Sequence, residues 1–245
     1  MRLPVLHPEG SCVFLAGRGT GQPLEGIVIA IAAAAKRTYA GVDEMQDRTK
    51  EVGLTKVIFD MSMSLDGFVK ASNATPEQPL GEGGERLHEW GFGGDERDRE
   101  VLAAQAEGGS GAIIAGRRTY DDSLPWWGAD GPHPPTRVFV VTHEAPDAVP
   151  ERSVYIFVTD GIGSALEQAK AVAGDKNVAV MGGSDIGRQF IEAGLVDEIG
   201  VHLVPVLSGS GTRMFEHLGG EHIQLETTSV IETPAAIHLR FRVVK

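Results

Sequence analysis

Hydrophobic and polar positions follow two alternating patterns from residue 54 onward. Short runs rich in Val, Ile and Phe, typical of buried strands, alternate with segments whose apolar residues recur at i, i+3, i+4 and i+7, the spacing of a helix with one buried face. Residues 162–173 show the helical spacing most clearly, and Asp160 just before them is the expected N-cap. This alternation predicts an α/β domain built on a sheet.

The predicted elements are short and regularly spaced. We expect strands at residues 55–63, 111–115, 137–142, 154–158, 177–181, 198–204, 224–231 and 236–243, and helices at residues 96–106, 118–123, 162–173 and 185–193. Only a turn containing Thr233 and Pro234 separates the last two strands, so they should form an antiparallel hairpin. The sheet is therefore expected to be mixed and mostly parallel.

Residues 1–53 differ in character from the rest of the chain. They carry six basic and six acidic residues, whereas residues 54–245 carry 16 basic and 28 acidic residues, so the whole net charge of −12 lies in the second part. One helix near residues 27–39 is predicted in the first part, without a core of its own. We expect an N-terminal extension of unassigned role at 1–53 and one domain at 54–245.

Composition and charge exclude several classes of function. The excess of acidic residues and the absence of a Lys/Arg run disfavour nucleic acid or an anionic membrane as the main partner. The longest apolar stretch, residues 26–35, is about half of the roughly 20 residues that span a bilayer as a helix. A single cysteine, Cys12, excludes a disulfide framework and a multi-cysteine zinc site, and the histidines lack ligand spacing, so no metal is expected. Cytoplasmic location is the expectation.

A first glycine turn of chemical interest covers residues 113–120. An apolar strand runs through Gly116 into a predicted helix start that bears Arg117, Arg118 and Thr119. A helix N-terminus offers unpaired N–H groups and a positive dipole end, and guanidinium groups add charge for a phosphate. Two arginines in a first turn oppose that dipole, so they form either an anion site or solvated surface.

A second glycine turn covers residues 178–187. Gly182 and Gly183 follow an apolar strand and precede a helix, and paired glycines let a phosphate approach the backbone closely. Ser184 can cap the helix or donate to a phosphate oxygen. The pattern is not GxGxxG, and an ordinary tight turn is the alternative. Two such turns in one sheet domain favour a phosphate-binding edge.

Five motifs in fixed order carry a family resemblance. They are MSLDGFV at 63–69, GRRTY at 116–120, VVTH at 140–143, MGGS at 181–184, and GLVDEI at 194–199 followed by LVPVLSGSGTRMF at 203–215. Together they resemble the dihydrofolate reductase-like superfamily, in the branch that contains the reductase domain of the riboflavin-biosynthesis deaminase/reductase. The resemblance covers about residues 54–245.

The resemblance implies a twisted, mostly parallel sheet with helices on both faces, a C-terminal antiparallel hairpin, and NADPH across the carboxyl ends of the strands, in agreement with the crevice rule for open α/β sheets. Carried over motif by motif, the implied cofactor-binding residues are Ser62, Gly116, Arg117, Arg118, Thr119, Thr142, His143, Met181, Gly182, Gly183, Ser184, Asp185 and Ile186.

The resemblance also implies an acid beside the substrate at Asp66. As a catalytic and substrate-binding residue, Asp66 would hydrogen-bond a polar substrate or, with a raised pKa, assist protonation of a C=N nitrogen. Phe68 and Val69 would line the nicotinamide side of the cleft, and Trp126 would line the substrate side. The alternative for Asp66 is an Asp-Gly turn without a chemical role.

Other side chains leave alternatives open. Aromatic residues in Gly- and Pro-rich loops suit either a wall for a flat heterocycle or ordinary packing. His202, within an apolar strand, is expected to be a core or interface histidine. Three acids fall in the stretch where a dihydrofolate reductase carries its pterin-binding carboxylate, without a firm match. The aromatic residues are Trp90, Phe92, Trp126 and Trp127, and the acids are Glu85, Glu89 and Asp95.

The expected function is hydride transfer from NADPH to a small heterocyclic or imine-like substrate, of the pteridine or ribosylaminopyrimidine class. Alternatives are dihydrofolate reduction proper and a non-catalytic dinucleotide-binding module. Riboflavin deaminase chemistry is excluded because one cysteine cannot complete its zinc site. A homodimer is expected, to which residues 209–215 would contribute.

Overall fold

A computed structural model describes residues 55–75, 77–107, 109–220 and 222–245, without the side chains of residues 106, 107 and 184. The predicted division near residue 53 and the predicted helix at 27–39 lie outside these residues or at their border, so both stay predictions. Within the described part, all eight predicted strands and all four predicted helices are present. The fold prediction is confirmed.

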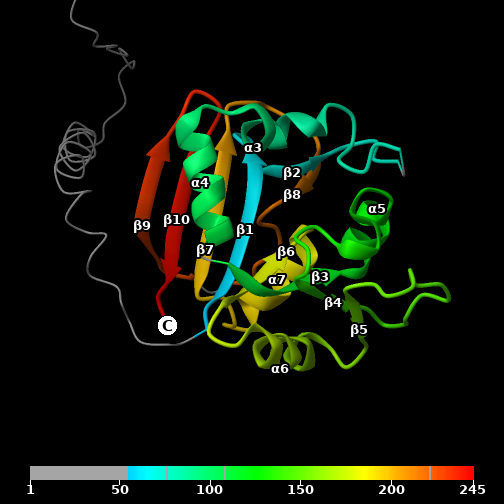
Figure 1. The fold of residues 1–245 in the computed structure, drawn as a ribbon. Helices are drawn as coiled ribbons and strands as arrows, with labels where there is room; N and C mark the ends of the chain where they lie inside the picture. The colour runs from blue at the N-terminus through cyan, green and yellow to red at the C-terminus, as the bar shows by residue number, and fades with distance from the viewer. Residues whose placement is uncertain (1–54, 76, 108, 221) are drawn as a thin grey trace, which may run out of the picture. The chain divides into compact units, whose positions relative to one another are not determined.

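The main sheet has eight strands in the order β5-β4-β3-β6-β1-β7-β10-β9 (Figure 1). Pairing is parallel from β5 to β7, and β10 joins β7 and β9 in the antiparallel sense. The strands are β1 (Val57–Ser64), β3 (Ser110–Gly116), β4 (Arg137–Val141), β5 (Tyr155–Val158), β6 (Asn177–Met181), β7 (Glu198–Val204), β9 (Leu225–Glu232) and β10 (Ile237–Val243).

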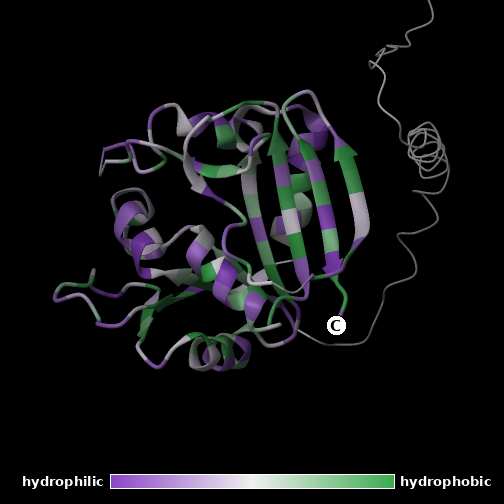
Figure 2. Ribbon diagram, turned by 180° about the vertical axis from the view of Figure 1, so that it is seen from behind, coloured by the Kyte–Doolittle hydropathy of each residue, from purple (hydrophilic) through white to green (hydrophobic). Residues whose placement is uncertain are grey.

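Helices cover the two faces of the sheet unequally. On one face, α6 (Ile162–Ala173) and α7 (Ser184–Glu192) bury the largest apolar cluster, which includes Phe59, Ile114 and Phe190. On the other face, α5 (Arg117–Trp127) lies on β3 and β4, while α4 (Glu96–Glu107) lies on β1, β7 and β10 (Figure 1). Seen from behind, the C-terminal strands have no helix across them (Figure 2).

Local sequence explains this layering. Residues 112–115 of β3 are fully buried, as expected for a central parallel strand covered on both faces. Gly187 brings α7 onto β1, because a Cβ there would lie 2.4 Å from the Phe59 ring. A second cluster packs α5 on β3 to β5, where Tyr120 meets Tyr155 edge-on with ring centroids 4.9 Å apart.

Two local expectations need correction. Asp160 is not the N-cap of α6; Gly161 occupies that position with φ +91°, and the Asp160 carboxylate instead accepts a hydrogen bond from the Ser164 hydroxyl. A small second sheet, β2 (Phe68–Ala71) with β8 (Gly211–Arg213), was not predicted, because three- and four-residue strands have no measurable alternation. A 3-10 helix η1 (Gly84–His88) and a short helix α3 (Glu89–Gly93) also lie between β2 and α4.

Candidate active site

A crevice opens where β1 extends beyond its neighbour β6. The pairing of β1 with β6 ends at Phe59 and Val180, whereas the pairing of β1 with β7 continues to Ser64 and Val204. A cleft of about 2290 Å³ lies there, bounded by α5 on one side and by β2, α3 and α4 on the other. Its position at the carboxyl ends of the parallel strands is where open α/β sheets bind ligands. The volume exceeds the roughly 300–1,000 Å³ of a pocket for one drug-sized molecule.

The two glycine turns meet at one wall of this cleft. Gly182 adopts φ +86°, and a Cβ at that position would lie 2.1 Å from the Thr119 hydroxyl oxygen, so the second turn lies directly against the first helix turn of α5. Around Gly183 no atom lies within 4 Å of a Cβ position, so its backbone is open to an approaching group. Two segments more than sixty residues apart therefore form one surface.

Arg117 and Arg118 have different surroundings. The Arg117 guanidinium binds both oxygens of Asp121 at 2.9 Å through Nε and donates through Nη1 to the Glu144 carbonyl at 2.8 Å. Within the described part of the chain, Arg118 makes no hydrogen bond or ion pair, and it lines both the main cleft and an adjoining pocket of about 390 Å³. Arg118 is thus the cation available to an anionic ligand.

The end of β4 supplies a third edge of the same wall. The Thr142 hydroxyl donates to the Glu144 carbonyl at 2.7 Å, which turns the chain sharply after the strand. His143 is exposed in that turn and lines the cleft. Asp185, in the first turn of α7, binds Arg188 at 2.8 Å and accepts from Gln189 at 3.0 Å.

The structure brings most of the predicted site residues together. The side chain of Ser184 lies outside the described part, so its expected role stays a prediction. The predicted residues that line the cleft are Ser62, Val69, Gly116, Arg117, Arg118, Thr119, Trp126, Thr142, His143, Met181, Gly182, Gly183, Asp185 and Ile186.

Asp66 is not placed as expected. It does not line the cleft; its carboxylate accepts hydrogen bonds from the Ser64 hydroxyl at 2.6 Å and from the N–H groups of Ser208 and Gly209 at 3.0 and 2.7 Å. These hydrogen bonds lower the pKa of Asp66 to about 2, opposite to the raised value that a proton donor needs. Asp66 fixes the loop after β7 to the end of β1.

Phe68 and Val69 were both expected to line the cleft, but only Val69 does so. Phe68 is buried beside the cleft rather than in it, under the Arg213 guanidinium at 4.4 Å from the ring centroid. Val69 is buried and lines the cleft, as expected. Alternate residues of a strand point to opposite faces, which explains the difference between neighbours.

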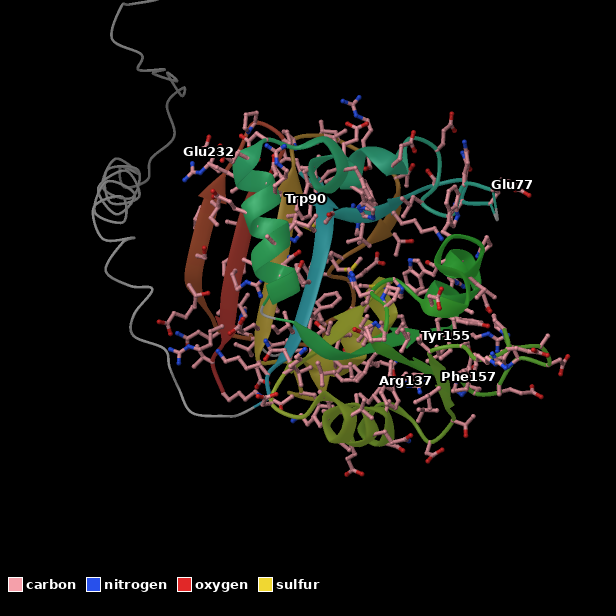
Figure 3. All side chains as sticks on the ribbon, in the orientation of Figure 1. Glu77, Trp90, Arg137, Tyr155, Phe157 and Glu232 are labelled. Carbon is pink, nitrogen blue, oxygen red and sulfur yellow. The ribbon has the colours of Figure 1, made fainter. Side chains whose placement is uncertain are left out.

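Aromatic side chains also border the cleft. Trp126 and Phe92 are 69% and 93% exposed at its rim. Trp90 is buried, and its Nε1 donates to the Ser62 hydroxyl at 2.9 Å. Trp126 and Phe92 are therefore available to a flat ligand. Trp90, labelled in Figure 3, is instead held in place by its hydrogen bond to Ser62.

The acids expected near a pterin lie in different places. Glu85 and Glu89 line the cleft from η1 and α3. Asp95 does not; its carboxylate accepts the N–H groups of Arg97 and Asp98 and so caps α4.

Two residues at the floor of the cleft, Asp60 and Gln105, were not singled out from the sequence, and no chemical role was expected for His202 beside them. Asp60 on β1, Gln105 on α4 and His202 on β7 line it side by side, with the His202 Nε2 2.7 Å from Asp60 Oδ1. The available signal was the alternation of β1, which places Asp60 and Ser62 on one face of a strand whose other face is apolar. His202 was expected in a core, and it does lie there, at the edge that opens to the cleft.

The described residues contain neither a membrane-spanning helix nor a cluster of metal ligands. Among the described residues, no helix is long and apolar enough to cross a membrane, and no three His, Cys, Asp or Glu side chains gather as metal ligands. Residues 211–213 of the predicted dimer segment pair with β2 of the same chain, and the homodimer stays a prediction.

An open mixed sheet with a long cleft at the carboxyl ends of its parallel strands, lined by two glycine turns, defines an α/β protein with a ligand crevice. A family profile described as the RibD C-terminal domain matches residues 55–239. The chain belongs to that family, which confirms the resemblance. No curated protein matches the sequence.

Solved structures agree in fold. A putative riboflavin biosynthesis protein from Shewanella sp. PV-4 has a TM-score of 0.59 at 19% identity, over 78% of this chain and 100% of that one. A deaminase/5-amino-6-(5-phosphoribosylamino)uracil reductase from Thermotoga maritima has a TM-score of 0.56 at 13% identity, over 78% and 57%. A pyrimidine reductase-like protein from Corynebacterium diphtheriae has a TM-score of 0.54 at 14% identity, over 78% and 92%.

Proposed function

We propose that this protein is an NADPH-dependent reductase of a small heterocyclic or imine-like substrate, of the pteridine or ribosylaminopyrimidine class. The observation that carries the proposal is the contact of Gly182 with Thr119, which joins the two glycine turns into one wall of a cleft large enough for two ligands. Membership of the RibD C-terminal domain family supports the same class of chemistry.

The wall suits the phosphates of a dinucleotide. The open backbone at Gly183 and the N-terminus of α7 offer N–H groups and a positive dipole end to a pyrophosphate. Arg118 and His143, both exposed at the cleft, suit the additional phosphate of NADPH. Arg117, held by Asp121, keeps the turn after β4 in place through the Glu144 carbonyl.

The chemistry of such an enzyme is divided between cofactor and chain. When bound, NADPH supplies the hydride, and the protein supplies orientation, exclusion of water and a proton. Val69 and Met181 offer apolar surface within the cleft. Trp126 and Phe92 offer faces on which a flat heterocycle can stack. Lys70 on β2 binds Asp122 on α5 at 2.7 Å and so links the two sides.

A substrate panel tests the proposal. Purified protein with NADPH is given dihydropterin, dihydrofolate, 5-amino-6-(5-phosphoribosylamino)uracil and a cyclic imine in turn, and the loss of reduced nicotinamide absorbance is followed. Consumption with at least one of them is expected. Consumption only with dihydrofolate, blocked by an antifolate, identifies a dihydrofolate reductase. NADPH binding without consumption of any of them identifies a binding module and contradicts the proposal.

A further inference from the structure

A network of four titratable side chains leads from the cleft into the interior between α4 and the sheet. This chain of side chains consists of Asp60, His202, His238 and Asp98. His202 Nε2 lies 2.7 Å from Asp60 Oδ1, His202 Nδ1 lies 2.7 Å from His238 Nδ1, and His238 Nε2 lies 2.9 Å from Asp98 Oδ1. The side chain of Asp98 is 0% exposed, and both histidines are buried. Burying an ionisable group costs folding free energy unless the group is paired. None of these four residues belongs to the two glycine turns that are proposed to bind the cofactor.

The neighbouring strand makes room for this chain. Asp60 faces Gly200 across the β1–β7 pair, and a Cβ at Gly200 would lie 2.1 Å from Asp60 Oδ2. The Asp60 carboxylate therefore lies over a glycine, where it also accepts from Arg240 at 3.1 Å and from Gln105 at 3.1 Å. Asp60, Gln105 and His202 line the cleft where β1 extends beyond β6.

Three short contacts in the chain each need one proton. His238 Nε2–H donates to Asp98, a proton lies between the two Nδ1 atoms, and His202 Nε2–H donates to Asp60. With both carboxylates ionised, this arrangement of donors places three protons on the four imidazole nitrogens, one more than two neutral rings hold. The pair of histidines stores one dissociable proton.

The hydrogen bonds rearrange after that proton leaves: the Asp60–His202 contact loses its proton, and Asp60 keeps the hydrogen bonds from Arg240 and Gln105. Gln105 Nε2 lies 2.9 Å from His202 Nε2, so its amide can donate to that nitrogen once the nitrogen is bare. His202 Nδ1–H then donates to His238, and His238 Nε2–H still donates to Asp98. Gln105 therefore offers a hydrogen-bond donor to the deprotonated form of His202.

Neighbouring residues favour the ionised form of both aspartates, Asp60 and Asp98. Burial would raise the pKa of Asp60, but the hydrogen bond and charge of His202 and the charge of Arg240 lower it overall. Burial would likewise raise the pKa of Asp98, and hydrogen bonds from Thr233 and His238 lower it. Burial lowers the pKa of His238, which favours the neutral form of that ring.

One further titratable group faces this chain from η1. Burial, together with the charge of His202, lowers the pKa of His88, which lines the cleft. The neutral form of His88 is therefore favoured, so His88 does not compete for the stored proton. The charged and titratable groups around His202 are Asp60, His88, Asp98, His238 and Arg240.

We propose that His202 and Asp60 deliver the proton that the reduction consumes, and that His238 and Asp98 are positioning residues that hold His202 in its protonated state. The inference rests on the proposed function. In the step, a hydride from the reduced nicotinamide forms a C–H bond at the substrate carbon and leaves the nicotinamide oxidised. The π pair of the C=N bond moves to nitrogen, which takes the proton shared by His202 Nε2 and Asp60 Oδ1. Water in the open cleft then returns a proton to the pair.

The test compares Asp60→Asn and His202→Gln with His222→Gln, an exposed histidine outside the cleft. NADPH affinity should stay within about threefold of wild type in all three variants. The reason is that Asp60 and His202 lie away from the two glycine turns that are proposed to bind the phosphates. With the substrate found in the panel, kcat should fall about 10²- to 10⁴-fold in the first two variants, the usual loss when an acid–base group is removed. His222→Gln should keep wild-type kcat.

The pH profile separates a catalytic role from a structural one. Wild-type kcat should fall as pH rises through the range in which the stored proton dissociates. In His238→Gln this fall in kcat should occur at lower pH, because His238 no longer helps to hold His202 in its protonated state. Nitrogen-15 NMR of the imidazoles at pH 7 should show three protons on the four nitrogens, without need of any substrate.

The possible failures are distinguishable. A wild-type protein that turns over a substrate while Asp60→Asn and His202→Gln keep kcat and the pH profile overturns the proton delivery alone. Two neutral rings at pH 7 overturn it as well. A wild-type protein that consumes no NADPH with any substrate removes the proposed function, and the proton delivery with it.

Discussion

The two halves of the sheet build the cleft in different ways. In the half from β5 to β6, β3 and β6 end in glycine turns, and the cleft is lined mainly by the backbone of these turns and by side chains close to them in sequence. In the half from β1 to β10, polar side chains lie beneath α4 and join residues far apart, such as Asp60 with Arg240. The first half shows its chemistry in local motifs, whereas the second exists only once the chain has folded.

The largest effect is expected when Asp98, the most deeply buried residue of the polar half, is replaced. Asp98→Ala leaves His238 Nε2–H and the Thr233 hydroxyl without their shared acceptor in a fully buried position. We expect a loss of about 3 kcal/mol in the free energy of unfolding, as when one partner of a buried pair is removed. Urea denaturation measures it. An unchanged midpoint would show that the polar half contributes nothing to stability.

The next largest effect is expected when the contact between the two glycine turns, Gly182 against Thr119, is disturbed. Gly182→Ala places a methyl group against Thr119 and strains a backbone with φ +86°, so NADPH affinity should fall roughly 10- to 100-fold, the equivalent of about 1–3 kcal/mol. Gly174→Ala is the matched control, since it has φ +65° with open space around it and lies outside the cleft. Equal losses of NADPH affinity in both variants would attribute the effect to general strain.

A smaller effect sharpens the role of charge. Arg118→Ala should weaken NADPH binding about tenfold, the equivalent of one charge-assisted hydrogen bond, and leave NADH binding nearly unchanged. Arg86→Ala, an exposed arginine that does not line the cleft, should alter neither. Fluorescence titration gives both constants. An equal loss for both cofactors would place Arg118 at the shared pyrophosphate.

The smallest effect concerns Asp66. Asp66→Asn should change kcat less than about threefold, because an uncharged side chain in a loop outside the cleft disturbs the hydride and proton steps little. The pKa of Asp66 is lowered to about 2, so its stabilisation is present above the unfolded value of 3.8 and is lost as pH falls toward 2. The difference in Tm between wild type and Asp66→Asn should therefore shrink over that range. A variant without turnover but with normal Tm would restore Asp66 as catalytic.

Sequence reasoning reached the glycine half because its signals are local. Gly116 and Gly182 each stand between a strand and a helix within ten residues of chain, so finding them needed no knowledge of distant contacts. The polar half was missed because Asp60, His202 and His238 are 36 to 178 positions apart, and only pairing of β1 with β7 and of β7 with β10 makes them neighbours. Asp66 was misplaced because a motif gives an acid's position in the chain and not the N–H groups that fold onto it.

The most direct test of the account is a titration of the purified protein with NADPH and then with NADH, following nicotinamide fluorescence and tryptophan quenching together. We expect NADPH to bind at least tenfold more tightly than NADH, with quenching from Trp126 at the rim of the cleft. Equal affinity would contradict the assignment of Arg118 and His143 to a phosphate, and binding of neither would contradict the glycine wall as a dinucleotide site.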